Sequence, residues 1–242
     1  MRNRVVIKAE ARRLIQQGHV SPILAMAVVL VIGFALDRLL DLVEGGSLFA
    51  SYQYRWAYYQ AAASGDIGSV QAVLDLMPEA TITSMSMTIA VYLITTVLQG
   101  GFCLFCMSIR RREDTPLATL LDGLSCAGRL IWCSIQLGVR IFLWSMLFFF
   151  PGIIAAYRYR FAIFNVLSDS ELSAGDAIRL SCEQTRGMKW ELFVLDLSFF
   201  GWMLLSSLTF GLLNLWITPY MTLCDLAYYD AARQELGGNG WQ

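Results

Sequence analysis

Residues 145–202 decide the fold, and they read SMLFFFPGIIAAYRYRFAIFNVLSDSELSAGDAIRLSCEQTRGMKWELFVLDLSFFGW. An apolar run ends at Pro151-Gly152, and a second apolar run rich in aromatic residues follows it. A polar amphipathic segment comes next, and apolar character returns at Leu192. This alternation of apolar and polar segments indicates a membrane protein with several spans.

The composition of the whole chain agrees with a membrane location. Of the 242 residues, 57% are hydrophobic and 15% are charged, whereas about a quarter of an ordinary soluble domain is charged. The formal net charge is −1, so the chain offers no polybasic surface, and we expect no nucleic-acid partner.

Three segments of the chain resemble a known family. They read FFPGI (residues 149–153), SAGDAIRLSCEQTRGMKWELFVLDLSFFGW (173–202) and TPYMTLCDLAYYD (218–230), and the basic opening at residues 1–25 is also similar. The family is the bacterial integral membrane family catalogued as domain of unknown function 975. The resemblance implies a membrane topology with further spans between these segments, and it implies no established biochemistry.

Six segments have the length and apolar character of membrane spans, for which about 20 residues are needed. They are residues 22–43, 82–109, 130–150, 151–167, 192–208 and 212–229. Residues 130–167 are too long for one span, and Pro151 gives the natural break between two helices. Gly100-Gly101 in the second span favours close contact between helices. The sequence predicts an all-α, polytopic membrane helix bundle that forms a single domain over residues 1–242.

Four further segments complete this organisation. Residues 1–21 are predicted to be a basic cytoplasmic lead-in on the lipid headgroups, and residues 44–81 an extracytoplasmic aromatic-rich loop. Residues 173–187 are predicted to form a cytoplasmic amphipathic helix between spans four and five. Ser173 and Asp176 have capping-box spacing there, and Gly187 suits its end. Residues 231–242 are predicted to be a flexible tail.

The basic residues predict the orientation. Most of them fall in the segments assigned to the cytoplasm, whereas Arg38 and Arg55 fall on the opposite side. The positive-inside rule therefore predicts that both termini are cytoplasmic. The resemblance implies the bacterial plasma membrane as the location of this multi-pass protein.

Ionisable side chains at membrane depth are the main candidates for a site. Each is unfavourable there by about 2.5–3.5 kcal/mol on insertion scales unless it is paired or hydrated. The candidates are Arg140, Arg158, Arg160, Asp196 and Asp225. Opposite charges on neighbouring helices predict Arg–Asp pairs that hold the bundle together, and the alternative is a water-lined cavity for an ion, a peptide or a lipid headgroup.

Two finer expectations concern side-chain positions. Asp196 is expected to point inward and to contact Arg158 or Arg160, or else Arg186 or Lys189. A set of rings recurs at helical spacing and predicts an aromatic face at the bilayer interface, with a ligand-stacking platform as the alternative. The rings are those of Phe49, Tyr52, Trp56 and Tyr59.

The sequence carries no motif for catalysis, for a metal or for a nucleotide. His19 is the lone histidine, and a metal site needs several convergent donors. Cys103 and Cys106 form a CxxC pair inside a membrane-length segment, where we expect packing rather than redox chemistry. We therefore expect no catalytic residue, no metal ligand and no cofactor.

Three classes of function remain open. The first is a non-enzymatic membrane protein of the assembly, envelope-stress or immunity type, whose partners are the lipid bilayer and a membrane protein or a second copy. The alternative is a small transporter or exporter subunit that uses the intramembrane Arg and Asp residues. A membrane-embedded enzyme is the third. A dry, packed bundle favours the first class, and a continuous polar cavity past Arg140 and Asp196 favours the second.

Overall fold

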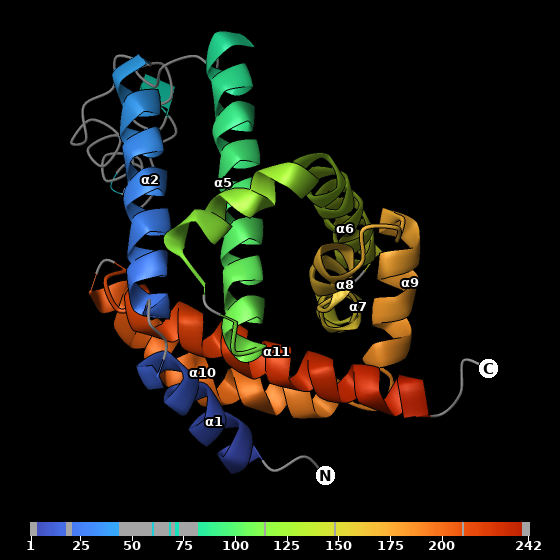
Figure 1. Ribbon diagram of the computed structural model, residues 1–242. Helices are drawn as coiled ribbons and strands as arrows, with labels where there is room; N and C mark the ends of the chain where they lie inside the picture. The colour runs from blue at the N-terminus through green and yellow to red at the C-terminus, as the bar shows by residue number, and fades with distance from the viewer. Residues whose placement is uncertain are drawn as a thin grey trace. The chain divides into compact units, whose positions relative to one another are not determined.

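The computed structural model describes residues 4–17, 21–43, 82–113, 115–147, 149–209 and 211–238, together with residues 60, 68, 71 and 72. All regular elements in these residues are helices (Figure 1). They are α1 Arg4–Gln17, α2 Pro22–Val43, α5 Ile82–Arg110, the 3₁₀ helix η1 Leu117–Cys126, α6 Ala127–Leu147, α7 Phe149–Arg158, α8 Ala162–Ser168, α9 Ala174–Gln184, α10 Lys189–Leu208 and α11 Asn214–Gly238. The all-α prediction is confirmed for this part of the chain.

The chain divides into two compact units. The first comprises Met1–Leu30 and Thr96–Gln242, and the second comprises Val31–Thr95. In the second unit, Arg38 Nη1 pairs with Asp41 Oδ2 at 2.8 Å, one turn further along α2. The predicted loop at residues 44–81 lies almost entirely outside the described residues. The side-chain contacts described below belong to the first unit.

Four helical stretches among the described residues are long and apolar enough to cross a membrane. They are Pro22–Leu42, Met85–Arg110, Leu117–Met146 and Lys189–Leu208. Many of their large apolar side chains are exposed, and Trp132, Phe142 and Trp202 are each more than half exposed. A helix that turns apolar side chains outward along its length suits lipid rather than water. These stretches overlap with the predicted first, second, third and fifth spans, and the third begins earlier than predicted because it includes η1.

The predicted fourth span, residues 151–167, is not one continuous helix. α7 ends at Arg158 and α8 begins at Ala162, with a turn between them. The two short helices run antiparallel to α6, and together they are called the α7–α8 limb below. Its N-terminal end lies at Ser145, where Gly152 has no room for a Cβ. At its other end, Arg129 near the start of α6 donates to the carbonyls of residues 169 and 170 at 3.0 and 2.7 Å. Residues 151–167 are separate from α6, as predicted, but they form two short helices and not the single helix expected. That they form a membrane span stays a prediction.

α11 differs from the predicted sixth span at both ends. It begins at Asn214 and continues to Gly238, so residues 231–238 are helical where the sequence predicted a flexible tail. Packing explains the extension, because Ala232 is 2% exposed and Leu236 lines a cavity beside α8 and α9. α11 is not among the four apolar stretches, and the count of six spans stays a prediction.

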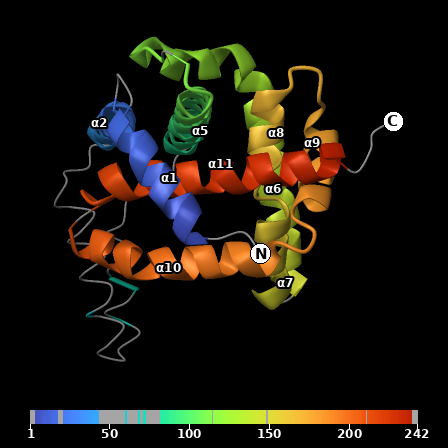
Figure 2. The same ribbon diagram turned by 60° about the horizontal axis from the view of Figure 1, so that its bottom comes forward.

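One face of the N-terminal helix α1 packs on other helices of the protein. In Figure 2 it crosses α11, with α10 beyond, and Ala11 at the contact is 1% exposed. Lys8 Nζ donates to Ser198 Oγ at 2.6 Å and lies 4.6 Å from the centre of the Phe199 ring. Burial at this contact lowers the pKa of Lys8. The inner face of α1 thus finds hydroxyl and aromatic partners on α10 and α11, and the placement of the lead-in on lipid headgroups stays a prediction.

α5 and η1 approach so closely that their backbones touch. A Cβ on Gly101 would lie 2.0 Å from the carbonyl oxygen of Leu120, and one on Gly123 would lie 2.7 Å from the backbone nitrogen of Gly101. A Cβ on Gly100 would meet the Leu130 side chain at 2.4 Å. The close helix contact expected at Gly100-Gly101 is therefore confirmed.

Candidate functional site

The site is built on the turn between α7 and α8. A break in a helix leaves backbone groups without intrahelical partners. Ser181 of α9 takes two of them, because its Oγ accepts from Phe161 N–H at 3.1 Å and donates to the Arg158 carbonyl at 3.0 Å. Thr185 Oγ1 also donates to this carbonyl at 3.2 Å and shares its proton with the Ser181 carbonyl at 2.8 Å. These bonds hold the turn in the orientation that presents Arg160 to α10 and α11.

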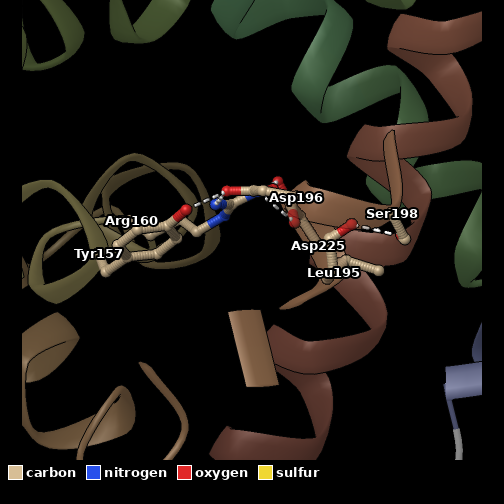
Figure 3. Close-up of polar contacts among 6 residues, drawn as sticks. All are labelled: Tyr157, Arg160, Leu195, Asp196, Ser198 and Asp225. Atoms are coloured by element: carbon tan, nitrogen blue, oxygen red, sulfur yellow. Dashed lines mark hydrogen bonds and ion pairs between the residues drawn. The ribbon is translucent and has the colours of Figure 1, made fainter. Parts of the chain in front are cut away.

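The Arg160 guanidinium joins two helices (Figure 3). Its Nη1 donates to Asp196 Oδ2 at 2.6 Å, and its Nη2 donates to Asp196 Oδ1 at 2.8 Å. The same Nη2 donates to Asp225 Oδ1 and Oδ2 at 2.9 and 3.0 Å. Tyr157 OH donates to Asp196 Oδ2 at 2.8 Å. Asp196 of α10 and Asp225 of α11 therefore share one cation, and the predicted contact between Asp196 and Arg160 is confirmed.

The cluster of Tyr157, Arg160, Asp196 and Asp225, called the Arg160 cluster below, is largely buried and unbalanced in charge. The side chains of Arg160, Asp196 and Asp225 are 18%, 25% and 17% exposed. One positive charge faces two negative charges, so the fully ionised cluster is negative. In a largely buried setting such an excess is unfavourable, because the low local dielectric weakens its stabilisation by water.

Two of the five predicted residues lie outside this cluster. Arg140 Nη2 lies 3.4 Å from Gln136 Oε1 on its own helix α6. Arg158 has an exposed side chain, and it contributes its backbone carbonyl to the turn. The prediction of one polar cluster of five residues is therefore wrong for these two. Arg158 and Arg160 stand on opposite sides of the turn, which directs one outward and the other to the carboxylates.

Sequence reasoning did not single out the residues that orient the cluster. Ser181 and Thr185 lie four residues apart, so they share the α9 face that packs inward, and this spacing was the available signal. Tyr157 lies one turn before Arg160 on the same limb, with its ring centroid 5.7 Å from the guanidinium carbon. No pattern in the sequence marks it.

A second polar network fixes α8 on α9. Asn165 Nδ2 donates to Gln184 Oε1 at 2.9 Å and to the Ala177 carbonyl at 3.1 Å, and Gln184 Nε2 donates to Asn165 Oδ1 at 3.0 Å. The two amide side chains are 2% and 4% exposed. They line a cavity of about 220 Å³, together with Ser168, Asp169, Leu172, Leu180, Tyr229, Arg233 and Leu236. Because the amides satisfy each other, the network acts as a structural clamp.

A second ion cluster joins α5 to α1 and α11. Arg110 Nε donates to Asp230 Oδ2, and Arg110 Nη1 lies 3.6 Å from Glu10 Oε1. It repeats the charge ratio of the Arg160 cluster, with two carboxylates on one guanidinium. The carboxylates of Asp230 and Glu10 are 42% and 51% exposed, so water screens their charge.

Other predicted features have separate outcomes. Over the described ranges, no group of three His, Cys, Asp or Glu side chains could hold a metal ion. Cys106 is fully buried, and Cys103 packs against the same apolar core, which agrees with the expected packing role. The aromatic face of Phe49, Tyr52, Trp56 and Tyr59 lies outside the described residues.

A family model matches part of the chain. No curated protein and no solved structure matches the chain. Residues 149–235 contain α7 to α10, most of α11 and every member of the Arg160 cluster. Residues 149–235 match the model of the family described as Protein of unknown function (DUF975), which confirms the resemblance expected from the sequence.

Proposed function

We propose that this chain is a non-enzymatic, multi-pass membrane protein that acts through contacts with another membrane protein or a second copy of itself. An assembly, envelope-stress or immunity role fits this class. The observation that carries the proposal is the internal pairing of charge, because Arg160 binds both Asp196 and Asp225. Outward-facing side chains such as Trp132 and Trp202 leave apolar surface for lipid and for a partner.

The proposed topology has six crossings and two cytoplasmic termini. Four crossings are the apolar stretches, one is the α7–α8 limb, and one is α11. The bond from Arg129 to the carbonyls of residues 169 and 170 supports the return of the limb to the side where α6 begins. The basic residues at 110–112 support the cytoplasmic assignment of that side.

Reporter fusions test this topology. A reporter that is active only outside the cytoplasm should be active after Gln60 and inactive after Gly238, and a cytoplasmic reporter should give the opposite result. Extracytoplasmic activity after Gly238, or cytoplasmic activity after Gln60, would contradict it.

The transporter alternative also has an observation in its favour. The α7–α8 limb is discontinuous, and Arg160 lies at its break between two carboxylates. Discontinuous helices with charges at the break line substrate sites in many transporters. The two functions differ in access of water to the Arg160 cluster, which a transporter must open to each side in turn.

Labelling of Cys224 separates the two functions. Cys224 precedes Asp225 and is fully buried. In a variant that keeps Cys224 and has its other cysteines replaced by alanine, we expect no reaction with an impermeant maleimide in membrane vesicles of either orientation. Reaction should appear after denaturation in detergent.

A matched control shows that the reagent reaches the protein. In a chain without its native cysteines, Ser170→Cys should react from one side of the membrane, because Ser170 is exposed. Reaction of native Cys224 from both sides would overturn the packed-bundle proposal in favour of the transporter.

A further inference from the structure

The two carboxylates of the Arg160 cluster meet at a single nitrogen. Arg160 Nη2 is 2.8 Å from Asp196 Oδ1 and 2.9 Å from Asp225 Oδ1. Hydrogen bonds of this length place the carboxylates of α10 and α11 around one NH₂ group of the guanidinium. Their burial disfavours two ionised carboxylates beside one cation, and the repulsion between the like charges adds to this effect.

Among the described residues, the groups around Asp225 supply no second cation. Arg160 and Asp196 are the charged groups that act on it. Tyr157 of α7, Cys103 of α5 and Cys224 of α11 also lie within electrostatic range, and each is neutral or negative. The nearby cations of α1 and α5 have other partners. Lys8 donates to Ser198 Oγ, Arg12 lies over the Tyr220 ring, and Arg110 pairs with Asp230 and Glu10. Lys8, Arg12 and Arg110 act on Cys224.

We propose that the Asp196–Asp225 pair is a proton-binding site that holds one exchangeable proton between α10 and α11. The proton comes from bulk water and binds a carboxylate oxygen, which leaves one carboxylate to balance Arg160. The protonated cluster is then neutral overall, which suits its buried setting. The two carboxylates titrate as one coupled unit, so the proton belongs to the pair.

Loss of this proton has a structural consequence. It leaves two ionised carboxylates on adjacent helices with one cation between them. Repulsion then acts directly across the contact of α10 with α11, so the proton makes this contact sensitive to pH. This inference goes beyond the proposed function, because it holds for a packed scaffold and for a transporter alike.

The Arg110 cluster provides an internal contrast. It has the same two carboxylates on one guanidinium, but Asp230 and Glu10 are 42% and 51% exposed, against 25% and 17% for Asp196 and Asp225. Solvent screens the charges of the exposed pair, so the excess of negative charge is far less unfavourable there. Burial, and not charge count alone, makes the Arg160 cluster a proton site.

Infrared difference spectroscopy of the full chain in lipid nanodiscs tests the proposal. In the native protein we expect the carbonyl band of a protonated carboxyl group to persist up to near-neutral pH, well above the ordinary aspartate pKa of about 3.9. Incorporation of aspartate labelled with ¹³C at the side-chain carboxyl should shift this band. The proposal would be overturned if the band were absent at pH values above the ordinary aspartate pKa, or if the ¹³C label did not shift it.

Substitutions then assign the band to the pair. Asp196→Asn and Asp225→Asn should each abolish it, because the remaining carboxylate pairs one to one with Arg160. Asp230→Asn should leave it unchanged. A band that survives in both cluster variants would overturn the assignment. If a variant does not elute as a monodisperse folded species, the isotope shift in the native protein still decides whether a buried aspartate holds the proton.

Discussion

Arg160→Met is expected to lower the free energy of unfolding by about 3–5 kcal/mol, because it leaves two largely buried carboxylates without their cation. Methionine keeps much of the side-chain volume, so the loss reports on charge more than on packing. The expected readout is a large decrease in the folded fraction during detergent-induced unfolding, together with less folded protein in the membrane.

The matched variants make this prediction specific to the shared cation. Asp196→Asn leaves Asp225 paired with Arg160, so it should destabilise the protein far less than Arg160→Met does. Adding Asp225→Asn to Arg160→Met should restore part of the lost stability, because it removes one unpaired charge. Equal losses in Asp196→Asn and Arg160→Met would contradict the sharing of one cation by two carboxylates.

Gly101→Ala is the second substitution with a large expected effect. The added Cβ would lie 2.0 Å from the Leu120 carbonyl oxygen, which belongs to the backbone and cannot rotate away. Overpacking typically destabilises a protein by about 1–3 kcal/mol, and a clash with backbone lies at the upper end or beyond. We expect a clear drop in unfolding temperature, because α5 and η1 must separate.

Gly138→Ala is the control for this effect. A Cβ at Gly138 of α6 meets no atom within 4 Å, so it adds a methyl group without a contact. It should leave the unfolding temperature nearly unchanged, and Gly123→Ala should behave like Gly101→Ala. An unaffected Gly101→Ala variant would mean that the two backbones are not in contact.

The elements that the sequence predicted well are those set by local patterns. The length of an apolar run gave the bounds of α2 and α5 to within a residue. The spacing of Ser173 and Asp176 gave the start of α9, where Asp176 N–H donates to Ser173 Oγ at 3.2 Å. Gly187 has a positive φ of 86° in the turn after α9, which agrees with its predicted role at the helix end.

The features that could not be predicted from the sequence depend on partners that are distant along the chain. The helix break after Arg158 leaves backbone groups within an apolar run without partners, and only the hydroxyls of Ser181 and Thr185 satisfy them. Asp196 was expected to have an arginine partner, but the sharing of that partner with Asp225 depends on the contact of α10 with α11. The helical extension past residue 230 likewise depends on packing against α8 and α9, which no local pattern records.

The turn between α7 and α8 also constrains the order in which the chain can fold. The backbone N–H of Phe161 and the carbonyl of Arg158 find their hydroxyl partners 20 to 27 residues later in the chain. During synthesis from the N-terminus, the limb therefore exists before the side chains that satisfy it. The turn can hold Arg160 against α10 and α11 only after α9 has packed on it. Docking of α9 must therefore precede completion of the Arg160 cluster.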